Sequence, residues 1–285
     1  MASLKDIRRR IRATKSMQQI FKAMETVAAA KLRRAQTRAH ESAPYAQKIT
    51  EMLAKLAGAA AELEHPLFKA REVKHTALVV VTADRGFAGA YNTNVLRVAE
   101  QRVRTAPQGS VKLVALGRKA RDYFRRRHYA TLAAYPELPG EASLEFARAR
   151  TEELTNWFLD GTVDRVEVVY SHYVNALVRQ IRTEVFLPIG AGETKEAPPD
   201  RGTIFEPDAE TIFGELLSRY ATAKLYAAMA DALASEHSAR MVAMGSARKN
   251  AGELVDSLTL TRNRLRQAAI TKEIAELVGG AEALK

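Results

Sequence analysis

The chain of 285 residues contains no cysteine, which excludes disulfide bridges, thiolate metal sites and cysteine nucleophiles and fits a reducing cytoplasm. Its longest apolar run, ALVVVTA at 77–83, is too short to span a bilayer. The first residues, MASLKDIRRRIRATK, lack the apolar core of a signal peptide. We therefore expect a chain that does not insert into a membrane by itself.

Positive charge, by contrast, is abundant and unevenly placed. The formal net charge is +11, and residues 1–40 carry eleven Lys and Arg side chains against only Asp6 and Glu25. A field this concentrated favours an acidic partner, which can be nucleic acid, anionic lipid or an acidic protein surface.

Residues 1–60 are expected to form a long helix that runs from residue 3 to about residue 58. Ser3 is the expected N-cap, because Asp6 follows three residues later as in a capping box. Pro44 is expected to bend or interrupt the helix, and Pro66 to close the segment. Apolar or small residues recur in steps of three and four, as in a coiled-coil seam: Ile7, Ile11, Thr14, Met17, Phe21, Met24, Ala28 and Leu32.

Residues 74–190 alternate strands with helices, which predicts a central α/β domain. The expected strands are HTALVVVTAD, VKLVALG and the paired VDRVEVVYSHYV and LVRQIRTEVFLPI, and the expected helices are 92–106, 118–127 and 143–160. Residues 191–207 are polar and rich in proline and glycine, as expected of a linker.

A helical period returns at Asp208, a possible cap, and continues through residues 208–285. About 75 residues at ~1.5 Å each make a rod on the order of 110 Å. The predicted fold is therefore α/β with long helices: an antiparallel coiled coil of the terminal helices plus a central, Rossmann-like α/β domain. Because the second helix is longer, its tip should project and need another protein to cover its apolar stripe. The expected seam is Leu254, Leu258, Thr261, Leu265, Ala268, Ile270, Ile274, Leu277, Ala281 and Leu284.

The segment DRGFAGAYNTN, 84–94, is the best candidate for a phosphate loop, since it follows a strand and precedes a helix. It lacks the lysine and Ser/Thr of a P-loop and is not G-x-G-x-x-G, so a tight turn with glycines at positive φ is the favoured interpretation. The six histidines are scattered and none has metal-ligand spacing. We expect no catalytic residue, cofactor or metal on this chain.

Three stretches nevertheless resemble one family closely. The N-terminal SLKDIRRRIRATKSMQQIFKAMETVAAAKLRRAQ, the central DRGFAGAYN and the C-terminal ITKEIAELVGGAEAL are similar to motifs of the γ subunits of F-type ATP synthases, in the same order. Ala88 departs from the pattern, because many relatives carry cysteine there.

This resemblance implies a central rotor shaft, one copy per complex, that couples proton flow through the c ring to ATP synthesis or hydrolysis on the β subunits by rotation. The implied partners are three α and three β subunits, the ε subunit and the c ring, and the implied location is the cytoplasmic side of the cell membrane, as a peripheral protein. The C-terminal tip would lie in a largely apolar sleeve of the α/β ring. The basic residues from Arg8 to Arg38, called here the basic band, would meet an acidic loop of the β subunits.

By family position, ring contacts are expected from both long helices: Lys22, Met24, Arg33 and Arg34 on the first, and Arg240, Arg266, Gln267, Thr271, Glu273, Ile274, Leu277 and Ala281 on the second. Two alternatives from the residues alone are a basic coiled-coil protein that binds nucleic acid and an enzyme with its site in the α/β domain. Aromatic residues make up only 7% of the chain and do not alternate with the basic runs, which disfavours the first.

Overall fold

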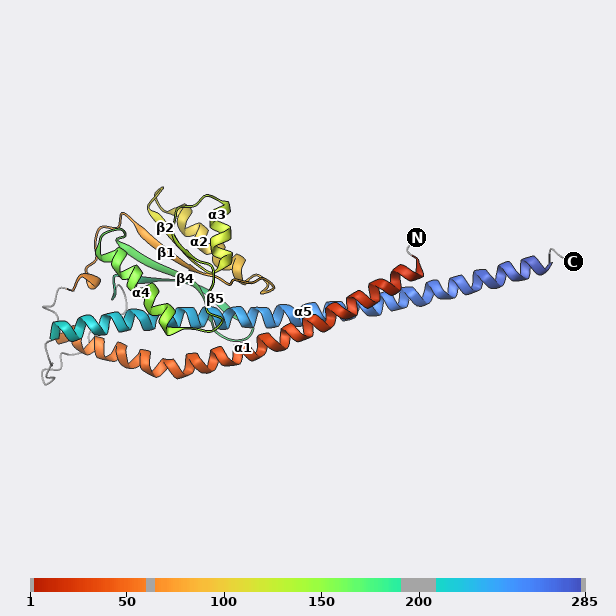
Figure 1. Cartoon of the computed structure of the whole chain (residues 1–285), viewed down its shortest axis with the longest axis horizontal. Helices are drawn as coiled ribbons and strands as arrows, with labels where there is room; N and C mark the ends of the chain where they lie inside the picture. Colours follow the sequence, from red (N-terminus) through yellow and green to blue (C-terminus); the bar gives the residue numbers. More distant parts are fainter. Residues whose placement is uncertain (1–2, 60–64, 191–208, 283–285) are drawn as a thin grey trace. The chain divides into compact units, whose positions relative to one another are not determined.

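The computed structural model of the chain describes residues 3–59, 65–190 and 209–282. Two long helices, α1 (Leu4–Ala59) and α5 (Ala209–Glu282), flank in sequence a five-stranded sheet with its own helices (Figure 1). The chain forms two compact units, residues 1–28 with 240–285 and residues 29–239. The expected linker 191–207 and the cap Asp208 lie outside the described residues, and the domain boundaries drawn from the sequence remain predictions.

The start of α1 shows why the helix begins at Leu4. The backbone N–H of Asp6 donates to Ser3 Oγ at 3.1 Å, and the Ser3 hydroxyl donates to Asp6 Oδ2 at 2.8 Å. These hydrogen bonds hold the pKa of the Asp6 carboxyl below its usual value. The predicted cap is confirmed. Of the two outcomes expected at Pro44, the interruption is wrong, because α1 continues through this exposed proline, whose fixed φ is itself helical. The bend stays a prediction.

In the first unit α1 and α5 pack as antiparallel helices. Ile7 and Ile11 are buried with Val255 of α5. Further along α1, a methyl group placed on Gly252 would lie 2.9 Å from Gln18 Nε2, and one on Gly245 would lie 3.1 Å from Glu25 Oε1. As the residue number rises on α1 it falls on α5, so the predicted antiparallel pairing holds within this unit. Gly245 and Gly252 each leave space for a side chain of α1.

Most of the predicted seam is confirmed: on α1 the buried or half-buried members are Ile7, Ile11, Thr14, Phe21, Met24, Ala28 and Leu32, and on α5 Leu258 and Leu265 pack against the buried cluster. The prediction is wrong by one residue at a single position on α1 and at the first position on α5. Met17 and Leu254 were expected to face the partner helix, but they are 50% and 51% exposed. Gln18 is half-buried instead, and Val255 is 8% exposed. Neighbouring residues on a helix lie about 100° apart, so hydrophobicity alone does not decide which of two adjacent candidates faces inward. Here the missing side chain of Gly252 leaves the space that the Gln18 amide fills.

The second unit contains a mixed sheet with strand order β3-β2-β1-β4-β5. The first four strands are parallel and β5 runs antiparallel to β4, its predicted partner. The elements are the short helix η1 (Pro66–Phe68), β1 (Thr76–Val81), α2 (Tyr91–Thr105), β2 (Val111–Leu116), α3 (Arg118–Arg126), β3 (Thr131–Tyr135), α4 (Leu144–Leu159), β4 (Arg165–Tyr173) and β5 (Arg179–Leu187). All but η1 and β3 were predicted.

Helices cover both faces of this sheet (Figure 1). Leu78 and Val80 of β1 pack on α2 and α3, for example on Phe124, whereas Val79 and Val81 belong to a second core with α4 and α5. The alternation follows from the two-residue period of a strand. The second core also includes residues of both long helices: Ile49, Leu53, Leu217, Ala221 and Leu225. The long helices are thus part of the hydrophobic core of the α/β unit.

The observed seam predicts effects of very different size for two adjacent substitutions. Val255→Gln should lower the free energy of unfolding by about 2 kcal/mol, because it places an amide in a buried apolar contact. Leu254→Gln should change it by about 0.5 kcal/mol or less, because this side chain is already half in water. Urea unfolding of the isolated chain, followed by circular dichroism, measures both, and a larger loss for Leu254→Gln would restore the seam drawn from the sequence.

Gly117, which joins β2 to α3, gives a second test of the fold. Its φ is +98°, and a Cβ there would lie 2.2 Å from the carbonyl oxygen of Thr82. Gly117→Ala should therefore destabilise the chain by about 2–4 kcal/mol. Gly86→Ala is the matched control, because a Cβ at Gly86 meets nothing within 4 Å. Equal melting temperatures for the two variants would contradict this account of Gly117.

Candidate functional site: charged and apolar surfaces of the long helices

The loop after β1 is the segment that looked most like a phosphate site. Both oxygens of Asp84 accept backbone N–H groups, from Arg118 at 2.7 Å and from Leu138 at 2.9 Å. The Asn92 side chain accepts the N–H of Ala83 at 3.0 Å. These side chains fasten three loops at the carboxyl end of the sheet. The geometry is that of a structural turn, as the sequence favoured.

The backbone of this turn differs in one respect from the prediction. Gly89 has the expected positive φ, +54°, but the other positive φ belongs to Phe87, +63°, and not to Gly86. A bulky residue in this region of φ is uncommon. The Phe87 side chain is 68% exposed. A phenylalanine offers no sequence signal for such a conformation.

Titratable groups do not assemble into a metal centre in the part of the chain that the structure describes, where no three His, Cys, Asp or Glu residues come together. His172 and Asp231 form a half-buried pair, in which His172 Nδ1 of β4 lies 2.5 Å from Asp231 Oδ2 of α5. Burial raises the pKa of the Asp231 carboxyl, and His172 opposes that rise. The pair connects the sheet to α5, as the structural interpretation of the histidines expects.

The basic band of α1 is exposed, and its members differ in their partners. Lys22 and Arg33 form no ion pair with another described residue. Arg34 Nη1 lies 3.8 Å from Glu141 Oε1, and Arg38 contacts the other oxygen of the same carboxylate. Lys22 and Met24, which is half-buried, belong to the first unit, whereas Arg33 and Arg34 belong to the second.

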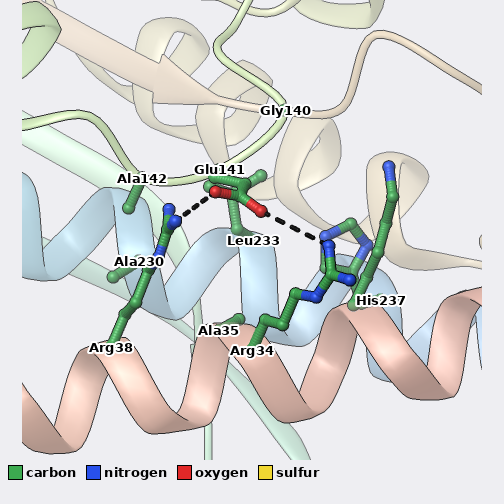
Figure 2. Close-up of a pocket in the computed structure, with 10 residues that line it drawn as sticks. Arg34, Ala35, Arg38, Gly140, Glu141, Ala142, Ala230, Leu233 and His237 are labelled. Carbon is green, nitrogen blue, oxygen red and sulfur yellow. Dashed lines mark ion pairs between the residues drawn. The ribbon is translucent and has the colours of Figure 1, made fainter.

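Arg34 and Arg38 line a groove with an apolar floor in the second unit (Figure 2). The floor is formed by Ala35 of α1 and by Ala230 and Leu233 of α5, and the loop 140–142 forms the opposite wall. Sequence reasoning did not identify Glu141, because it lies more than a hundred residues from Arg34 and belongs to no motif.

The expected contact residues on α5 fall into two groups. Arg240 is half-buried, whereas Arg266, Gln267, Thr271 and Glu273 are exposed. Beyond them the apolar side chains of the tip are exposed as well: Ile270 48%, Ile274 56%, Leu277 74% and Val278 59%. The side chain of Ala281 is not among those described. In the chain by itself, the tip therefore presents an apolar stripe to water, as an unpaired end should.

No helix in the described ranges has an apolar stretch of the length and character that crossing a membrane requires.

The comparisons with known proteins cover the chain almost from end to end. The model of the ATP synthase family matches residues 3–284. The ATP synthase gamma chain of Desulforamulus reducens is 47% identical over 289 residues, and that of Moorella thermoacetica is 44% identical over 285, each with full coverage of both chains. The gamma chain of Chloroherpeton thalassium is 41% identical, covering 100% of this chain and 99% of the relative.

A solved structure adds the fold. A chain in the cryo-EM structure of the Euglena gracilis mitochondrial ATP synthase, OSCP/F1/c-ring, rotational state 3, matches 99% of this chain with a TM-score of 0.72 at 21% identity, and 94% of that chain is covered. The fold, the family model and the identities over the full length agree, and this chain belongs to the family of ATP synthase gamma chains.

Proposed function

We propose that this chain is the central rotor shaft of an F-type ATP synthase. The observation that carries the proposal is the identity of 41–47% with gamma chains over the full length, on a chain whose two terminal helices pair antiparallel in the first unit. A shaft needs no active site, and ATP is made or hydrolysed on the β subunits. The comparisons give no support to a nucleic-acid-binding role.

The shaft acts through its asymmetric surface, which presents a different side to each β subunit. One chain stands within three α and three β subunits, turns with the ε subunit and the c ring as protons pass, and forces each β subunit in turn to change its affinity for nucleotide. In this role the chain is peripheral to the membrane, held there by the complex on the cytoplasmic side of the cell membrane.

The ring contacts divide by chemistry. We assign the basic band, including Lys22, Arg33 and Arg34 with Met24 beside it, to an acidic surface of the β subunits. Single exposed charge pairs are worth about 0.2–1 kcal/mol, so a band of them can guide a moving surface without fixing it at one angle. On α5 we assign ring contacts to Arg240, Arg266, Gln267, Thr271 and Glu273. We assign the apolar Ile274, Leu277 and Ala281 to contacts with an apolar sleeve at the top of the ring.

Co-expression with the cognate α and β subunits tests the function. We expect one copy of this chain to elute with three α and three β subunits in size-exclusion chromatography, and the ATPase activity to belong to that assembly. If the α and β subunits assemble and hydrolyse ATP equally well without the chain, and the chain elutes alone, it is not their shaft.

The apolar tip gives a sharper test within the same complex. Ile274→Lys with Leu277→Lys should weaken binding of the chain to the ring at least about tenfold, since each buried side chain of this size contributes about 1.5–3 kcal/mol. The control is Lys272→Gln with Glu276→Gln, which removes an exposed ion pair at 3.5 Å from the same turns. Co-purification yield and torque in single-molecule rotation are the measurements, and equal values for both double variants would exclude an apolar sleeve around the tip.

A further inference from the structure

Glu141 occupies a position on the basic band that an external carboxylate could occupy. Its Oε1 faces Arg34 and its Oε2 faces Arg38, so that one carboxylate bridges two guanidinium groups one helical turn apart on α1 (Figure 2). Lys31 lines the same groove. The three basic side chains leave the groove positive after Glu141 has been counted.

The carboxylate comes from a short loop with few polar contacts of its own. The loop is fixed on one side by the N–H of Leu138, bonded to Asp84, and on the other by Ser143, whose Oγ caps α4 by accepting the N–H of Phe146 at 3.2 Å. Among the described residues, the polar side-chain contacts of residues 139–142 are the two ion pairs of Glu141. A Cβ at Gly140 would meet nothing within 4 Å, so the loop borders open space at this residue.

We propose that Glu141 is an internal competitor, which holds the Arg34–Arg38 pair in the free chain and yields it to a carboxylate-rich segment of a protein partner. The inference rests on the proposed function, in which the basic band meets an acidic protein surface. By pairing with Arg34 and Arg38, Glu141 lowers the affinity of this part of the basic band for external carboxylates until such a partner displaces it.

The chemistry of the groove favours a carboxylate side chain as the occupant. A carboxylate already lies between the two guanidinium groups, with one oxygen paired to Arg38 and the other 3.8 Å from Arg34. Charge-assisted pairs with guanidinium groups favour a carboxylate over an uncharged polar side chain. The floor of Ala35, Ala230 and Leu233 is apolar and suits the methylene groups of an acidic side chain. The exchange replaces one carboxylate by another, so neither arginine is left without a partner at the end of it.

The solvent exposure of the three side chains limits how strongly Glu141 can compete with an external carboxylate. The side chains are 72% exposed for Arg34, 41% for Arg38 and 47% for Glu141, so water and salt screen both pairs. An internal competitor of this modest strength lowers the apparent affinity for an external carboxylate by about three- to sixfold.

The test is the binding of a fluorescein-labelled hexaglutamate peptide to the purified full-length chain, followed by fluorescence anisotropy at low salt. Glu141→Gln should bind the peptide about three- to sixfold more tightly than the unmodified chain. The control is Glu137→Gln, which removes the same charge from the same loop, where Glu137 is 85% exposed and lies 4.0 Å from Arg118. That variant should gain much less.

A third variant locates the effect. Arg34→Gln with Arg38→Gln, added to Glu141→Gln, should return the affinity to the level of the unmodified chain or below it. Equal gains for Glu141→Gln and Glu137→Gln, or a gain that survives the loss of both arginines, would overturn the proposal. Neither result affects co-assembly with α and β subunits, so failure of this inference is separate from failure of the shaft function.

Discussion

Burial of one apolar seam between two antiparallel helices is the constraint on which the first unit depends. A long helix in water is stabilised mainly by packing of its apolar face and not by its own hydrogen bonds. The packed cluster of the helix pair reaches Leu265 on α5, and from residue 270 to 279 every described side chain is exposed. The same seam that stabilises the helix pair therefore also decides where α5 needs another protein.

The second unit depends on the fastening of its loops at the carboxyl end of the sheet. Asp84 accepts N–H groups from the start of α3 and from the loop after β3, and that second loop carries Glu141 three residues later. The contact of Glu141 with Arg34 and Arg38 is thereby connected to the sheet through a short stretch of backbone. The segment 84–94, which resembled a ligand site in the sequence, has a structural role, and through this loop it is connected to the basic band of α1.

Much of this fold could be predicted because its signals are local. The apolar run of β1, the alternating pattern of β4 and β5 and the Ser3 cap depend on neighbouring residues alone, and each was predicted close to its observed bounds. The strand β3 was missed because it is a short edge strand, partly exposed, with two alanines among its five residues. Two seam positions were predicted one residue away, Met17 in place of Gln18 and Leu254 in place of Val255, because hydrophobicity does not decide which of two adjacent residues faces inward. Glu141 could not be found at all, since its partnership exists only once the chain has folded.

The exposed end of α5 has a mechanical consequence. In the first unit the paired part resists twisting as two helices joined by side-chain contacts, whereas the last turns carry any twist through one helical backbone. Torsional stiffness therefore falls where the partner helix stops, near Leu265. A load applied to the tip would first deform those turns elastically. Abrupt steps of rotation at one end of a rotary machine would then reach the other end smoothed.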